Sequence, residues 1–164
     1  MIHMTCGSTG AGKTTYSQSL ARKIGGVVFS IDEWMVLLFG DDAPKNLTPA
    51  WLQPRVERCE TQIRSSVLQL GKLGIPSILD LGFQQFKHRR KYIDFAESSE
   101  LSVKLHFLDV DAKVRWSRVQ NRNRDHGETY HLNISRPMFD YIETTWEPPA
   151  LSELLASNGV RVMG

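Results

Sequence analysis

The stretch GSTGAGKTT, residues 7–15, combines residue types that bind phosphate. It matches the spacing G-x-x-x-x-G-K-[ST] through Gly7, Gly12, Lys13 and Thr14. A glycine-rich turn lets successive backbone N–H groups converge on phosphate oxygens, and the helix that follows adds the positive end of its dipole. The spacing therefore predicts a loop that holds the terminal phosphates of a nucleotide.

Residues of this loop have distinct expected roles. Lys13 is placed to reach the β and γ phosphates, where it acts in catalysis, and the hydroxyl of Thr14 is placed to coordinate Mg²⁺. The residues that we expect to bind the nucleotide are Gly7, Ser8, Thr9, Gly10, Ala11, Gly12, Lys13, Thr14 and Thr15.

Two acidic residues come at the ends of predicted strands. Asp32 follows the apolar run 27–31, and Asp80 ends the run PSILD. The Asp32 carboxylate is placed to accept the proton of an acceptor hydroxyl, which makes it a candidate general base. Asp80 is the candidate acid that holds Mg²⁺ together with the hydroxyl of Thr14. The alternatives are a helix cap at Asp32, with Glu33 in the first turn, and a capping or turn role for Asp80.

The segment after the fourth predicted strand is rich in arginine. Arg115, Arg118 and Arg122 share one face of a predicted helix, where like charges repel unless an anion lies opposite. A triphosphate is such an anion, and the polar loop that follows is of the kind that closes over a nucleotide. We therefore expect a lid at about residues 112–133, with Arg118 and Arg122 as catalytic and nucleotide-binding residues. The alternative is a solvated helix face that nearby aspartates partly neutralise.

The basic run KHRRK, residues 87–91, lies in the helix predicted after Asp80. Two interpretations stay open for it. One is a site for a phosphorylated acceptor, and the other is a solvated helix face.

Strands and helices alternate along the chain and must position these groups. Apolar runs predict strands at 2–6, 27–31, 76–83 and 102–110, and VRVM near residue 162 predicts an edge strand. Helical periodicity predicts helices at 13–24, 52–70, 86–98, 111–123, 135–145 and 150–157. We expect residues 32–49 to be irregular, and Pro54 to lie in the first turn of its helix or to kink it. Such alternation predicts a parallel sheet with ligands at the carboxyl ends of its strands.

Length and composition are those of an ordinary globular protein. With 164 residues, 41% of them hydrophobic and 23% charged, the chain predicts one domain, residues 1–164. The net charge of +2 gives no general reason to expect nucleic acid or a membrane as partner.

Cys6 and Cys59 lie in apolar patterns typical of buried thiols in a reducing cytosol. No apolar run reaches the length of a membrane span, and no signal segment is present, so we expect a cytoplasmic location.

The chain resembles the small P-loop kinases that are often described only as AAA-type ATP-binding proteins. These are related to polynucleotide 5′-kinases, zeta-toxin kinases and chloramphenicol phosphotransferases. The resemblance rests on GSTGAGKTT, SIDEWMVLLFGDDAP, W..PRVERCE, LDLGF....HRRKYIDFA and LDVDAKVRWSRVQNRN, and it ends near EPP. It implies an α/β fold, the three-layer P-loop NTPase fold, with a five-stranded, mostly parallel sheet flanked by helices and an Arg-rich lid. It also implies ATP-dependent phosphorylation of a hydroxyl.

The resemblance implies roles for individual residues as well. Asp32 falls where such kinases carry the general base. Arg118 and Arg122 form the R-x-x-x-R of the lid, in which the first arginine tends to stack on adenine and the second to contact the transferring phosphate. The acid and the helix that shape the acceptor side in polynucleotide kinases correspond to Asp80 and to Arg89 or Arg90.

One position departs from the polynucleotide kinases. Three residues after their base, these kinases use an arginine to grip the phosphate of the acceptor, whereas this chain has Met35. The departure puts a polynucleotide acceptor in doubt. Trp34, Met35, Leu38 and Phe39 line an apolar pocket for a small molecule in one interpretation and pack in the core in the other.

Together, these features favour an ATP-dependent kinase with ATP and Mg²⁺ as cofactors. It would transfer the γ-phosphate to a hydroxyl of a small molecule or nucleotide-type acceptor. One alternative is a polynucleotide 5′-kinase, and another is a non-catalytic ATP-binding module that regulates a partner. Nucleic acid is thus a possible partner but not the favoured one, and we expect no membrane as partner.

Overall fold

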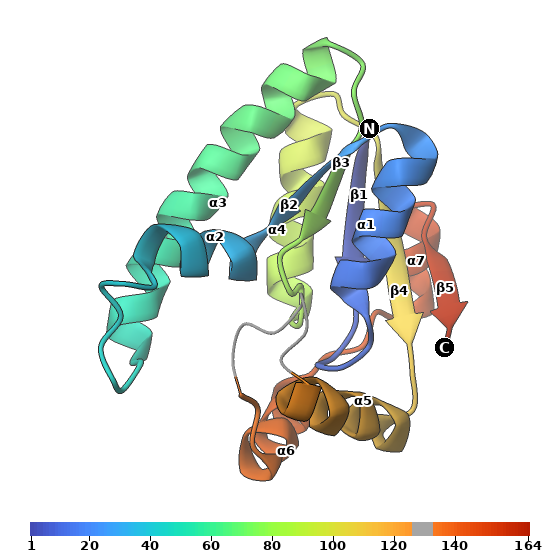
Figure 1. The fold of residues 1–164 in the computed structure, drawn as a ribbon. Helices are drawn as coiled ribbons and strands as arrows, with labels where there is room; N and C mark the ends of the chain where they lie inside the picture. Colours follow the sequence, from blue (N-terminus) through green and yellow to red (C-terminus); the bar gives the residue numbers. More distant parts are fainter. Residues whose placement is uncertain (126–132) are drawn as a thin grey trace.

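The computed structural model describes residues 1–125 and 133–164, in which strands and helices alternate (Figure 1). The strands are β1 (Ile2–Cys6), β2 (Val27–Ser30), β3 (Ser77–Asp80), β4 (Val103–Asp109) and β5 (Val160–Met163). The helices are α1 (Lys13–Ile24), α2 (Ile31–Phe39), α3 (Pro49–Lys72), α4 (Phe86–Ser98), α5 (Ala112–Asp125), α6 (Arg136–Thr145) and α7 (Leu151–Ala156).

The strands form one parallel sheet in the order β2-β3-β1-β4-β5. β1 lies in the centre, where Ile2 is in register with Ser77 of β3 and Val103 of β4. Parallel strands need crossover connections, and each connection between successive strands here contains at least one helix. All carboxyl ends of the strands therefore lie at one edge of the sheet, beside α5 and α6 in Figure 1.

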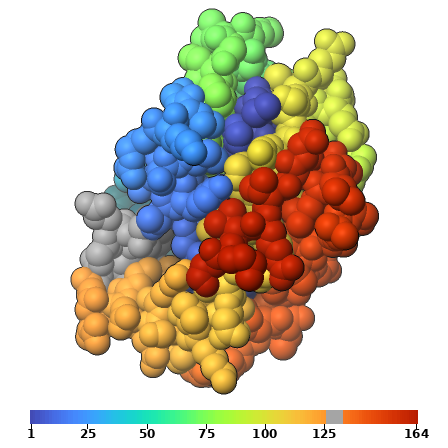
Figure 2. Space-filling view, turned by 90° about the vertical axis from the view of Figure 1, so that its right-hand side faces the viewer, coloured from blue at the N-terminus to red at the C-terminus, as the bar shows by residue number. Residues whose placement is uncertain are grey.

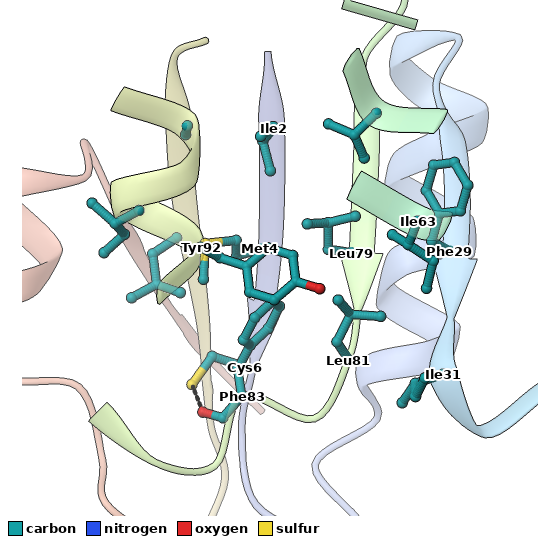
Figure 3. Close-up of a cluster of buried hydrophobic side chains, with 14 of the residues drawn as sticks. Ile2, Met4, Cys6, Phe29, Ile31, Ile63, Leu79, Leu81, Phe83 and Tyr92 are labelled. Carbon is teal, nitrogen blue, oxygen red and sulfur yellow. Dashed lines mark hydrogen bonds between the residues drawn. The ribbon is translucent and has the colours of Figure 1, made fainter. Parts of the chain in front are cut away.

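The main hydrophobic core lies between the sheet and helices α3, α4 and α7. Alternate residues of β1 point to this face, and Ile2, Met4 and Cys6 are fully buried there (Figure 3). Figure 3 shows them with Ile63 of α3 and Tyr92 of α4. Burial raises the pKa of the Cys6 thiol to about 12. Both cysteines are buried, as predicted.

Helix α1 covers the opposite face through a polar network. His3 and His106 are joined by their Nδ1 and Nε2 atoms at 2.9 Å, and the hydroxyl of Tyr16 lies 2.8 Å from Nδ1 of His106. The hydroxyl of Ser17 donates to the Oγ1 atom of Thr5 at 3.0 Å. Directional hydrogen bonds thus fix the helix that follows the glycine-rich loop onto the sheet.

We expect acid to destabilise the fold through His106. Burial, together with the nearby His3 and Lys104, lowers the pKa of His106 to about 4. The unfolded chain takes up this proton near pH 6.5, whereas the folded protein does so only near pH 4, so the free energy of unfolding falls as the pH drops through that interval. The contribution of this group has an upper limit of about 3 kcal/mol.

Melting temperatures between pH 7 and pH 4 test this expectation. His106→Gln keeps an uncharged polar side chain, so its melting temperature should fall less steeply with acid than that of the unmodified chain. Parallel curves for the two proteins would contradict the role of His106.

Two local expectations are wrong. Residues 32–49 are not wholly irregular, because α2 runs as far as Phe39 and its N-terminus is capped by the side chain of Ser30. Most residues of α2 are apolar, so no polar–apolar periodicity marks the helix in the sequence. Of the two alternatives for Pro54, the first-turn position is wrong, since α3 begins at Pro49 and Pro54 lies inside the helix.

The C-terminal segment returns to the sheet and is fixed by a buried ion pair. In Figure 2, α7 and β5 form the red surface beside β4 (yellow) and α1 (blue). Arg89 of α4 donates from Nε to Oε1 of Glu153 in α7 at 2.5 Å, and from NH2 to Oε2 at 3.1 Å. The charge of Arg89 is therefore paired with a protein carboxylate, and the structure gives no support for a role of Arg89 in binding a phosphorylated acceptor.

None of the described helices is both long and apolar enough to cross a membrane.

Candidate nucleotide-binding site

The segment between β1 and α1 forms the glycine-rich loop. Gly10 and Gly12 have φ values of +81° and +90°, which L side chains rarely adopt. A Cβ atom at Gly10 would lie 2.5 Å from the backbone oxygen of Arg115, and one at Gly7 would lie 2.9 Å from that of Leu108. Glycine is thus needed both for the turn and for the close approach to β4 and α5.

Lys13 and Thr14 begin helix α1 and point toward different partners. The Nζ atom of Lys13 donates to the backbone oxygens of Gly7 at 2.9 Å and Ser8 at 3.4 Å, so the ammonium group lies against the loop. The hydroxyl of Thr14 donates to Oδ2 of Asp80 at 2.7 Å. The two residues that we expect to hold Mg²⁺ are therefore in contact.

Sheet order explains this contact. Asp80 is the last residue of β3, which pairs with β1, the strand that leads into the loop. Asp80 is only 6% exposed, at the edge where α1 begins. A hydroxyl and a carboxylate side by side are the hard oxygen ligands that Mg²⁺ prefers.

Asp32 lies at the same edge of the sheet, one strand further out. Ser30 of β2 is in register with Asp80, and Asp32 follows in the first turn of α2 with its side chain exposed. The N-cap of α2 is Ser30, whose Oγ atom accepts from the backbone N–H of Glu33 at 3.4 Å, so the capping interpretation of Asp32 is wrong. Among the described residues, no hydrogen bond joins Asp32 to the loop.

The arginines of α5 have different surroundings. The NH1 atom of Arg118 lies 3.5 Å from the backbone oxygen of Ala11 in the loop. The Nε atom of Arg122 is buried and has no hydrogen-bond partner in the described part of the chain. Arg115 is paired with the carboxylate of Glu143 in α6. The prediction that Arg115, like Arg118 and Arg122, faces a triphosphate is therefore wrong. Of the expected lid, residues 126–132 lie outside the described residues.

Sequence reasoning missed Glu143. It lies 135 positions from Ser8, whose hydroxyl donates to it at 2.5 Å, and 28 positions from Arg115. No motif surrounds Glu143, and an acidic residue within a predicted helix is too common to mark a site. Contacts between residues so far apart in the sequence become visible only in the folded structure.

The apolar residues of α2 divide between the core and the surface. Trp34, Met35 and Phe39 pack against the main core, which confirms the core interpretation for them. Leu38 is 58% exposed and lies outside that cluster.

The fold and the glycine-rich loop define a P-loop protein. The model of the AAA domain family matches residues 2–138, and the chain belongs to this family. The resemblance inferred from the sequence motifs is thereby confirmed. A comparison with curated protein sequences finds no significant match.

Solved structures agree on the fold. A candidate kinase from Chloroflexus aurantiacus is 14% identical with a TM-score of 0.72, over 99% of this chain and 86% of that chain. Kti12 from Chaetomium thermophilum, in complex with ADP-AlF3, is 13% identical with a TM-score of 0.69, over 99% and 89%. A gluconokinase from Sinorhizobium meliloti is 16% identical with a TM-score of 0.63, over 98% and 81%. These matches confirm the P-loop NTPase fold, with a sheet that is wholly parallel in the described residues.

Proposed function

We propose that the protein is an ATP-dependent kinase that uses Mg²⁺ and phosphorylates a hydroxyl group. The observation that carries the proposal is the 2.7 Å contact of Thr14 with Asp80 directly beside the glycine-rich loop. P-loop proteins hold magnesium and the terminal phosphates with such a hydroxyl, an acid and a loop lysine. Family membership supports a phosphotransferase, as does the likeness to the structure described as a gluconokinase.

In the proposed reaction, the acceptor oxygen forms a bond with the γ-phosphorus, and the bond from that phosphorus to the β–γ bridging oxygen breaks. ADP leaves, and Asp32 accepts the proton of the acceptor hydroxyl. Lys13 and the loop amides stabilise the negative charge of the phosphate oxygens, and Arg118 and Arg122 add positive charge from the lid. Because these groups position the reactants and neutralise the charge of the phosphates, removing one of them should reduce the rate of phosphoryl transfer far more than the stability of the fold.

The residues present fit the two proposed cofactors. Mg²⁺ binds through one or two carboxylates, substrate phosphates and waters, and Thr14 with Asp80 offers such oxygen ligands. When bound, the metal ion neutralises charge on the phosphates. The buried Nε atom of Arg122, which has no partner among the described residues, fits a site for an anion beside the lid.

A small molecule or nucleotide-type acceptor is favoured over a polynucleotide. Met35, which stands where polynucleotide kinases use an arginine, packs against the core. Arg89 is buried with Glu153, and Arg90 is paired with Asp94. Both of these α4 arginines are thus paired with acidic side chains, which does not favour a role in gripping the phosphate of a polynucleotide.

An acceptor screen tests the proposal. ADP release from Mg-ATP is measured with sugars, nucleosides, nucleotides and 5′-hydroxyl oligonucleotides, and products are identified by mass. We expect at least one small molecule to gain a phosphoryl group and to raise ADP release well above the acceptor-free background. Activity on oligonucleotides alone would assign a polynucleotide kinase instead. Tight Mg-ATP binding with no active acceptor would contradict the kinase and leave a nucleotide-binding module.

A further inference from the structure

Glu143 of α6 connects the glycine-rich loop with the lid helix α5. Its Oε1 atom accepts a hydrogen bond from the hydroxyl of Ser8 at 2.5 Å. The guanidinium of Arg115 donates to both carboxylate oxygens, from NH1 at 2.7 Å and from NH2 at 2.6 Å. We call Ser8, Arg115 and Glu143 the latch.

Arg115 extends the latch to the main chain of the loop. Its NH1 atom also donates to the backbone oxygen of Thr9 at 3.2 Å, and its Nε atom donates to that of Val110 at 2.9 Å. Arg115 is only 6% exposed, and a buried guanidinium without its acid is strongly unfavourable. Hydrogen bonds, first from Arg115 and then from Ser8, outweigh burial and lower the pKa of Glu143, so this carboxylate is charged at neutral pH.

The latch joins the loop to a packed pair of helices. Val119 of α5 is buried with Phe139 of α6, and Trp116 packs against them. The loop comes so close to this pair that Gly10 has no space for a side chain beside the backbone of Arg115. In Figure 1, α5 and α6 lie together beneath the segment that joins β1 to α1.

We infer that Glu143 is a positioning residue for nucleotide binding, which fixes loop residues 7–15 against the α5–α6 pair through the latch. The inference rests on the proposed function, because the same helix pair carries Arg118 and Arg122. A loop held in place before the nucleotide arrives loses less conformational freedom on binding, and that loss otherwise subtracts from the affinity. The latch also sets the distance between the loop amides and the arginines of the lid.

Calorimetric titration of the full chain with Mg-ATP tests the inference. Glu143→Ala removes both contacts of the carboxylate, Ser8→Ala removes only the contact with the loop, and Glu143→Gln keeps an acceptor oxygen. Asp140→Ala is the matched control, since it removes an acid from the same helix whose partner, Arg136, is exposed.

The expected losses follow from the net value of hydrogen bonds to a charged group: Glu143→Ala removes those from Ser8 and Arg115, whereas Ser8→Ala removes only its own. Glu143→Ala should weaken Mg-ATP binding about ten-fold and Ser8→Ala about three-fold. Glu143→Gln should retain part of the affinity, and Asp140→Ala should change it less than about two-fold. The double variant Ser8→Ala/Glu143→Ala should bind as weakly as Glu143→Ala alone, because the hydroxyl has already lost its partner. A role in stability alone does not produce this non-additive effect on affinity.

An unchanged affinity in a folded Glu143→Ala protein would overturn the inference, as would additive losses in the double variant. If Glu143→Ala does not fold, Ser8→Ala and Glu143→Gln are tested singly, and unchanged Mg-ATP affinity in both folded proteins overturns the inference. The outcomes also separate this inference from the proposed function. Failure of the unmodified chain to bind Mg-ATP contradicts both, whereas equal binding by the unmodified chain and the latch variants contradicts the latch alone.

Discussion

Replacing Lys13 by alanine is expected to weaken Mg-ATP binding about a hundred-fold and to slow phosphoryl transfer on the order of a thousand-fold. The Nζ atom lies against the loop, where it donates to the backbone oxygens of Gly7 and Ser8. In the proposed function this charge neutralises the β and γ phosphates, and Lys13 is the one charged side chain of residues 7–15. Calorimetric titration with Mg-ATP measures the loss of affinity, and ADP release with an active acceptor measures the loss of rate.

Lys23→Ala is the matched control for this change. Lys23 lies in the last turn of the same helix and is exposed, so its removal changes the net charge equally without touching the loop. We expect its affinity for Mg-ATP to equal that of the unmodified chain. Equal affinity of the Lys13→Ala protein would mean that the glycine-rich loop is not the nucleotide site.

Replacing Asp32 by asparagine is expected to reduce phosphoryl transfer between about a hundred-fold and ten-thousand-fold while Mg-ATP binding is retained. Asparagine keeps the size of the side chain but cannot accept the proton of the acceptor hydroxyl. Asp32 lies in the first turn of α2, at the sheet edge where Asp80 ends the neighbouring strand. Single-turnover transfer to an acceptor found in the screen, at saturating Mg-ATP, measures the chemical step.

The neighbouring residue provides the control for Asp32. Glu33→Gln changes the charge of the same helical turn by the same amount, and Glu33 is also exposed. We expect it to transfer phosphate at nearly the unmodified rate. Normal transfer by the Asp32→Asn protein would remove Asp32 as the base, but it would leave the nucleotide site unaffected.

Local sequence signals predict much of the fold. The expected ranges 2–6, 13–24 and 86–98 coincide with β1, α1 and α4, because apolar runs and helical periodicity mark them clearly. Helix α2 was missed since its apolar sequence lacks this periodicity. The start of α3 was placed too late, which made a first-turn position one of the two alternatives for Pro54. The sheet order, which places β1 between β3 and β4, has no local signal at all.

The candidate site divides in the same way. The glycine-rich loop is a local motif, and the order of its residues is enough to predict its shape. The contact of Thr14 with Asp80 needs the pairing of β1 with β3, and the contact of Ser8 with Glu143 needs the packing of α6 beside the loop. Arg115 shows why spacing alone misleads, since a shared helix face does not reveal which anion each arginine meets.

The most direct test of the central claim is a titration of the ¹⁵N-labelled chain with Mg-ATP, followed through its assigned backbone amide resonances. If the loop holds the terminal phosphates, the amides of residues 7–15 should shift most, and omitting Mg²⁺ should weaken the effect. Lys13→Ala should suppress these shifts, whereas Lys23→Ala should preserve them. Saturating Mg-ATP that leaves the loop amides unmoved, or that moves only amides elsewhere, would contradict the account.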